Sequence, residues 1–309
     1  QLLYAQASLS QHAGDAEKAA EFAQRSMEKV LLAVEAHLPQ EEIDQSLPVA
    51  LARLFVEISL PQEAVQAART ALRIHPAHVD ACALLAQSLL ASGQIDQAIA
   101  SAHLATALPP DRLDLRQQLA EILDAAQEWQ AAYEERRTLL ERIPKPGPEH
   151  LYEYAESALR ARHPEVTIQV CEQLMAEAEH DGTALAIYSK AIASQGRKEE
   201  AIQLLTQATQ DMPSHPAAWL VLSQIYEEQD NAAKSLEILR LAYQAASDEP
   251  QVLLALGEAY LAAQSPTQAL VPLRQAHSLV NGSANQQTSH PLTSRIAFQL
   301  GQTLFQLGH

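Results

Sequence analysis

The sequence has few of the residues on which disulfide-linked, membrane-spanning or nucleotide-binding proteins depend. Its two cysteines, Cys82 and Cys171, form no CxxC pair, and two cysteines cannot hold a chain of 309 residues together. We expect both to be small buried apolar residues. No apolar run reaches the ~18 residues that a membrane-spanning helix needs. The nine glycines form neither a GxGxxG pattern nor a P-loop, so nucleotide sites of these types are not indicated.

Catalytic patterns are also missing. The chain contains no GxSxG and no HExxH, and its histidines are scattered. The HPAH stretch at 75–78 falls between two predicted helices, where a solvated loop is a simpler interpretation than a metal site. We therefore expect no enzymatic activity, no cofactor and no metal.

Basic residues are scarce relative to acidic ones. There are 21 Lys and Arg against 38 Asp and Glu, a net charge of −17, which would repel nucleic acid and anionic membrane surfaces. A basic protein or peptide remains a plausible partner. The start, QLLYAQASLSQH, lacks the basic region of a signal peptide, so we predict a cytoplasmic protein whose targeting segments, if any, lie outside this sequence.

A period of about 34 residues runs through the chain. Pro76, Pro110 and Pro144 are each 34 positions apart. Small residues recur at intervals of 34 or 35, namely Ala64, Ala98, Ala132, Thr167, Ala201, Ser235 and Ala269. Such a repeat predicts a stack of similar units, each burying its apolar face only against its neighbours.

Each unit reads as two helices. Residues 78–93 place Cys82, Leu85 and Leu89 on one stripe, and residues 94–111 place small residues such as Ala98 on another, both at the 3.6-residue period. Gly93 can close the first helix with a positive φ, and Pro110 stops the second. The small residues should let the two helices approach closely, with large residues of the facing helix packed on them.

The pattern resembles the tetratricopeptide repeat (TPR). Trp219, Leu222 and Tyr226 match its first helix, and Gly196, Ala201, Leu205, Ala208 and Pro213 match its turn and second helix. The resemblance implies an all-α fold, an α-α superhelix in the form of a right-handed TPR solenoid. It should contain about eight helical hairpins and a final single helix.

The register predicts one superhelix over residues 1–309. We expect the repeats at 1–38, 45–78, 79–112, 113–146, 148–181, 182–215, 216–249 and 250–283, with a half repeat at 294–309. Irregular insertions are expected at 38–47 and 281–293. Because the last helix has no second helix after it in this sequence, we expect further chain or another molecule to cover it.

In TPR proteins the first helices line a concave surface on which partners bind. By register this surface carries Arg53, Glu57, Asp114, Glu121, Asp124, Glu149, Glu153, Glu156, Lys190, Leu220, Gln224, Glu228, Leu254 and Glu258. Asp80, Glu227, Arg160 and Arg295 fall there too, which gives eleven acids and four bases. An acidic concavity attracts cationic ligands, although the acids could also reflect the overall composition. The chaperone-binding members use a Lys/Asn/Arg set that these positions lack. Apolar residues lie toward the ends, Leu84 and Leu90 on one side and Leu220, Val221, Leu254 and Phe298 on the other.

These patterns favour a protein-interaction scaffold that binds a peptide or protein segment, with a basic segment as one form of the hypothesis. Two alternatives remain open at this point. The chain can be a regulatory or targeting region of a larger enzyme or signalling protein, or a self-associating assembly module. The sequence does not decide the oligomeric state.

Overall fold

All regular structure in the described part of the protein is helical. The computed structural model describes residues 2–35, 46–107, 111–178, 181–282 and 291–308. Seventeen helices lie there: α1 (Leu2–His12), α2 (Ala16–Glu35), α3 (Leu47–Glu57), α4 (Pro61–Ile74), α5 (Val79–Ala91), α6 (Ile95–Ala107), α7 (Leu113–Ala125), α8 (Trp129–Arg142), α9 (Pro148–Arg160), α10 (Pro164–Glu177), α11 (Gly182–Ser194), α12 (Lys198–Asp211), α13 (Pro216–Glu228), α14 (Ala232–Ala245), α15 (Pro250–Ala262), α16 (Pro266–Gly282) and α17 (Pro291–Gln306). The first sixteen form eight hairpins and α17 follows singly, which confirms the predicted all-α solenoid class. Most of the two predicted insertions, and Pro110, lie outside the described residues.

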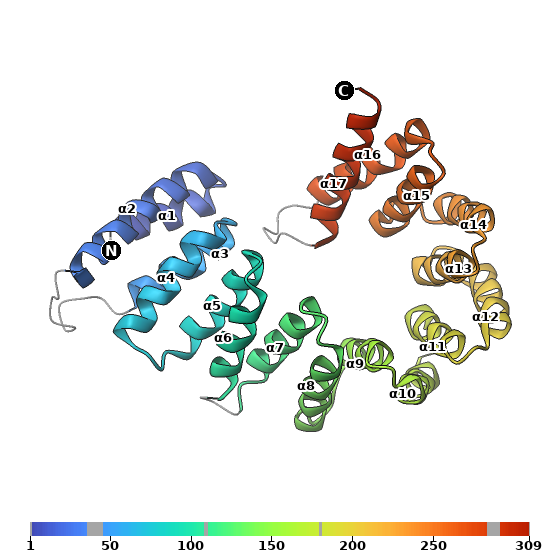
Figure 1. The fold of residues 1–309 in the computed structure, drawn as a ribbon, viewed down its shortest axis with the longest axis horizontal. Helices are drawn as coiled ribbons and strands as arrows, with labels where there is room; N and C mark the ends of the chain where they lie inside the picture. Colours follow the sequence, from blue (N-terminus) through green and yellow to red (C-terminus); the bar gives the residue numbers. More distant parts are fainter. Residues whose placement is uncertain (1, 36–45, 108–110, 179–180, 283–290, 309) are drawn as a thin grey trace. The chain divides into compact units, whose positions relative to one another are not determined.

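The chain divides into two compact units (Figure 1). Unit 1 is Gln1–Pro144 and contains α1 to α8, whereas unit 2 is Lys145–His309 and contains α9 to α17. Within each unit, the two helices of a hairpin pack on one another and on the first helix of the next hairpin. Neither helix of a hairpin buries its apolar face alone, so each hairpin depends on its neighbours.

The turn inside each hairpin repeats one backbone conformation. A left-handed residue occurs at intervals of 34 or 35, with φ of 59° at Ser59, 75° at Gly93, 62° at Gln127, 65° at Arg162, 88° at Gly196, 56° at Asp230 and 54° at Gln264. The positive φ expected at Gly93 is confirmed. Five of these seven residues are not glycine and accept a conformation that costs an L-residue about 1–2 kcal/mol. The packing of the two helices therefore imposes the turn, whichever residue occupies it.

The row of small residues forms the seam of each hairpin. All seven predicted members are buried, from Ala64 and Thr167 to Ser235 and Ala269. Four positions further along the second helix, the occupant varies. Arg136 in α8, Cys171 in α10 and Leu273 in α16 hold this position, and all three are buried. Tight approach is visible at Gly257, where an added Cβ would lie 2.6 Å from Leu273.

Within the described ranges, none of the helices combines the length and the apolar character that crossing a bilayer would require.

Candidate functional site

A groove runs along the first helices of unit 2. Its larger part has a volume of about 820 Å³ and receives side chains from α9, α13, α15 and α17. The residues that line it are Arg160, Leu220, Ser223, Gln224, Glu227, Gln251, Leu254, Ala255, Glu258, Ala259, Ala262, Leu292 and Arg295. First helices of this unit therefore share one hollowed surface.

A second hollow of about 410 Å³ continues this groove toward α11. It is lined by Glu156, Thr183, Ala186, Ile187, Lys190, His215, Pro216, Ala217, Leu220, Val221, Gln224 and Gln251. Leu220, Gln224 and Gln251 line both hollows, so the two form one continuous surface, called the unit 2 groove below. It spans five successive first helices.

The floor of the unit 2 groove is apolar and its middle carries amides. Leu254 is buried and Leu220 is half-buried, and the small side chains of Ala255 and Ala259 keep the surface open between them. Gln224 and Gln251 are exposed on neighbouring helices. A glutamine amide can donate and accept at once, so this pair can bond to the backbone of a bound chain.

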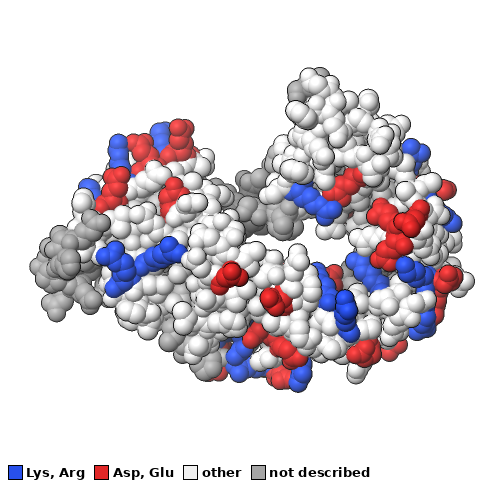
Figure 2. Space-filling model, in the orientation of Figure 1, with Lys and Arg blue, Asp and Glu red and all other residues white. Residues whose placement is uncertain are grey.

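The charges of the unit 2 groove are balanced. Its acids are Glu156, Glu227 and Glu258 and its bases are Arg160, Lys190 and Arg295, three of each sign. On the face seen in Figure 2, Asp and Glu side chains lie interspersed with Lys and Arg over unit 2. The acidic excess of the whole chain is therefore not concentrated in this groove.

Ion pairs hold most of these charged groups. Arg295 on α17 donates from Nε and Nη2 to the two carboxylate oxygens of Glu258 on α15, at 2.8 and 2.7 Å. Arg160 donates to Glu156 at 3.2 Å within α9. Glu227 accepts a 2.8 Å bond from the hydroxyl of Ser235. Lys190 makes no ion pair in the described part of the chain, so it and Glu227 keep charge available to a ligand.

Ten of the residues predicted for this surface line the unit 2 groove. They are Glu156, Arg160, Lys190, Leu220, Val221, Gln224, Glu227, Leu254, Glu258 and Arg295. Three others lie on unit 2 outside it. Glu149 and Glu153 are exposed on α9, and Glu228 forms a 3.2 Å ion pair with Lys198. Phe298, predicted at the apolar end, is exposed on α17 and does not line the groove.

The remaining predicted residues lie on unit 1. Arg53 and Glu57 are exposed on α3, and Glu121 is exposed on α7, where it accepts a 3.3 Å bond from Gln117. Asp124, also on α7, forms a 2.6 Å ion pair with Arg136 of α8, and these side chains keep only 16% and 8% of their exposure. Asp124 therefore joins the two helices of its hairpin and offers little charge to a partner.

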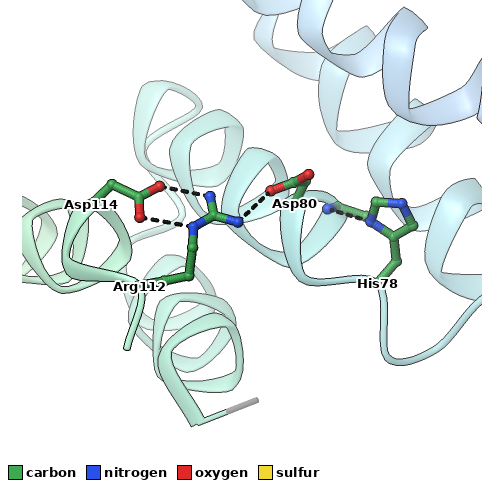
Figure 3. Close-up of polar contacts among 5 residues, drawn as sticks. His78, Asp80, Arg112 and Asp114 are labelled. Carbon is green, nitrogen blue, oxygen red and sulfur yellow. Dashed lines mark hydrogen bonds and ion pairs between the residues drawn. The ribbon is translucent and has the colours of Figure 1, made fainter. Parts of the chain in front are cut away.

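Asp114 at the start of α7 is also neutralised within the protein. Figure 3 shows Arg112 between Asp114 and Asp80. Arg112 donates to Asp114 at 2.8 and 2.6 Å and to Asp80 at 3.2 Å, so it connects the starts of α5 and α7. The hydrogen bond from Arg112 lowers the pKa of Asp114. His78, one repeat before Arg112, caps α5 by accepting a 3.3 Å bond from the Ala81 N–H.

Neutral residues of the groove were missed at the level of sequence. Gln251 and Ala255 hold the same register positions as the charged candidates, but as neutral residues they were not predicted to belong to the site. Ser223 and Ala259 lie one place from such positions. Register alone assigns these positions to the surface of the first helices, whatever the charge of the side chain.

Comparisons with known proteins agree with the fold. The family model described as tetratricopeptide repeat matches residues 60–110, 158–225 and 193–246. A search of curated proteins gave no match. A tetratricopeptide repeat protein from Parabacteroides merdae superimposes with a TM-score of 0.57 at 16% identity, covering 84% of this chain and 98% of that one.

Two further solved structures resemble the chain more loosely. Yeast Tom70 matches with a TM-score of 0.49 at 11% identity, over 94% of this chain and 61% of that one. YrrB, titled a TPR protein with an unusual peptide-binding site, matches with a TM-score of 0.40 at 17% identity, over 62% of this chain and 98% of that one. The repeats in the sequence, the hairpins in the structure and the matching family model lead to one conclusion: residues 60–110 and 158–246 of the chain consist of tetratricopeptide repeats.

Proposed function

We propose that the protein is an interaction scaffold, without catalysis of its own, that binds an extended polypeptide segment in the unit 2 groove. The observation that carries this proposal is the continuous surface across five first helices, with an apolar floor and exposed amides in its middle. An extended segment can place alternate side chains on such a floor while its backbone bonds to amides.

The charges of the groove suggest the composition of the segment. Because Glu258 and Glu156 are already paired with Arg295 and Arg160, a strongly charged ligand would have to compete with existing ion pairs. An apolar segment with one or two charges avoids that competition. The apolar side chains would pack on Leu220 and Leu254, the two leucines of the floor.

A basic residue in the segment remains part of the hypothesis. Glu227 supports it, because its carboxylate accepts a bond from the hydroxyl of Ser235 and pairs with no cation among the described residues. Glu149 is a further exposed acid of unit 2, on α9, that such residues could approach. Glu227→Gln should therefore weaken the binding of peptides that contain lysine or arginine and leave the binding of neutral peptides unaffected.

The experiment that tests the proposal is peptide selection against matched leucine variants. Peptides would be selected from a random displayed library on the wild-type protein and their affinities measured for Leu220→Asp and Leu241→Asp. Leu220 lies in the groove on α13, whereas Leu241 is exposed on α14 and lies outside it. Circular dichroism would check that both variants keep their helices.

We expect Leu220→Asp to weaken the selected peptides about ten-fold or more, because it places a charge on the apolar floor. Leu241→Asp should change affinity less than about two-fold. Equal losses in the two variants, or a wild-type protein that retains no peptide, would contradict the proposal.

A further inference from the structure

A second groove lies along α4 in unit 1, and α4 is the second helix of its hairpin. Gln62, Gln66, Arg69 and Arg73 follow one another at intervals of three or four residues and are all exposed, so they share one face of α4. A groove of about 680 Å³ lies along it, lined by Leu31, Gln62, Glu63, Val65, Gln66, Arg69, Thr70, Arg73 and Gln94. This α4 groove is built from second helices, whereas first helices line the unit 2 groove.

In the part of the chain that the structure describes, neither arginine of the α4 groove has a carboxylate partner. Arg69 donates to the amide oxygen of Gln97 at 2.8 Å. Arg73 forms no ion pair within the described residues. Glu63, an acid that also lines the groove, accepts a 3.4 Å bond from Gln24. Two like charges one helical turn apart are unfavourable when nothing compensates them.

This situation differs from that of other arginines on the second helices of unit 1. Arg25 on α2 pairs with Glu21 at 2.8 Å, and Arg137 on α8 pairs with Glu141 at 3.3 Å. Arg136 on α8 pairs with Asp124. Acids outnumber bases by 38 to 21 in the chain, so partners are common. Figure 2 shows basic side chains gathered over α4.

We infer that the α4 groove binds an acidic segment of another protein, whose carboxylates pair with Arg69 and Arg73. A guanidinium forms two parallel hydrogen bonds with a carboxylate, and a pair of them one turn apart can engage two acids of an extended chain. The amides of Gln62, Gln66 and Gln94 can bond to the backbone of that segment. The half-buried Leu31 adds an apolar contact, so acids interspersed with leucine-like residues fit the groove best.

A peptide fits this surface better than a nucleic acid does. Nucleic acid carries a dense line of phosphates. Two arginines can pair with only a few of them, and the rest would be repelled by a protein with a net charge of −17. A short segment with a few carboxylates brings negative charge only to the groove itself.

The test is fluorescence anisotropy with a short labelled peptide of glutamates and leucines. A peptide with glutamines in place of the glutamates is the ligand control. The site variant is Arg69→Gln with Arg73→Gln. The matched variant is Arg162→Gln with Arg274→Gln, which removes the same charge from two exposed arginines that also form no ion pair in the described residues.

We expect the glutamate peptide to bind the wild-type protein and the site variant to bind it about ten-fold or more weakly. The matched variant should change binding less than about two-fold. Hydrogen exchange should slow in α4 when the peptide is bound. The inference is overturned if the wild type does not bind the glutamate peptide, if both double variants lose affinity equally, or if the glutamine peptide binds as tightly. These variants leave the unit 2 groove untouched, so failure here is distinct from failure of the proposed function.

Discussion

Arg136 in unit 1 and Leu273 in unit 2 occupy the same position of the repeat and are held by opposite chemistry. Each follows the small seam residue by four places, Ala132 in one hairpin and Ala269 in the other. Arg136 forms an ion pair with Asp124 of the first helix, whereas Leu273 packs against Gly257 of its first helix. The fold therefore tolerates a charge or a large apolar side chain here, provided that the facing helix supplies the matching residue.

The largest expected effect comes from breaking the charged version of this contact. Asp124→Asn removes the negative charge that faces Arg136 and breaks the 2.6 Å ion pair of a nearly buried guanidinium. We expect unit 1 to lose about 3 kcal/mol of unfolding free energy, measured by denaturant titration. Glu21→Gln, which breaks the exposed Glu21–Arg25 pair of the same unit, is the control and should have a much smaller effect.

Replacing the charged Asp124–Arg136 contact by an apolar one tests whether the two hairpins are equivalent. A double variant, Asp124→Leu with Arg136→Leu, should be within about 1 kcal/mol of the wild type, because a buried ion pair is replaceable by well-packed side chains. If the double variant is as unstable as Asp124→Asn, the charge at this position is required and the two hairpins are not equivalent.

The apolar version of the contact should be sensitive to added volume. Gly257→Ala places a Cβ 2.6 Å from the fully buried Leu273, which must then move. We expect a loss of about 2 kcal/mol in the unfolding of unit 2, since overpacking outweighs the gain in helix propensity. At Gly301 on α17 an added Cβ meets nothing within 4 Å, so Gly301→Ala should be neutral or slightly stabilising. A loss of stability at Gly301 equal to that at Gly257 would show that helix backbone effects, and not the Leu273 contact, are responsible.

Cys171, which holds the same position in α10, should make the stability of unit 2 depend on pH. Burial raises the pKa of the Cys171 thiol from 9.0 to about 12. A raised pKa means that the folded state favours the neutral thiol. The contribution of this thiol to the free energy of unfolding is therefore fully present below pH 9 and is lost as the pH rises toward 12. We expect the wild type to lose about 1.4 kcal/mol more than Cys171→Ala between pH 8 and pH 10, measured by thermal melting. Parallel pH curves for the two proteins would contradict this account.

The sequence anticipated those features that depend on the repeat. Ala64, Thr167 and the other seam residues are buried as predicted, because a fixed spacing on a helix determines which face a residue shares. The first helices do line a groove in unit 2. The division of the chain at Pro144 was not anticipated, since the period of 34 residues continues across it.

The charges of the site were less predictable for a physical reason. Register places Glu258 on the groove, but only the folded chain brings Arg295 to it from 37 residues away. Asp124 likewise occupies a groove position by register, yet its side chain reaches Arg136 instead. Spacing along a helix fixes a face, whereas the partner of a long charged side chain depends on neighbouring helices.

The smallest expected effect concerns the turn that both hairpins share. Gln127 and Gln264 hold the left-handed position of the α7–α8 and α15–α16 hairpins, with φ of 62° and 54°. Glycine accepts this conformation without strain, so Gln127→Gly and Gln264→Gly should each stabilise their unit by about 0.5–1 kcal/mol. Equal gains in the free energy of unfolding, measured by calorimetry, would show that the energy of the turn does not depend on whether Arg136 or Leu273 follows the small residue of the hairpin. A loss in either variant would contradict that reading.

The scaffold account is tested most directly by locating a bound peptide. A photo-crosslinking amino acid would be introduced at Gln224, in the unit 2 groove, and in a separate protein at Leu241, outside it. Mass spectrometry would then measure crosslinks to a peptide selected on the wild-type protein. The account predicts abundant crosslinks from position 224 and few from position 241. Crosslinks that are equally frequent at both positions, or found mainly at 241, would contradict it.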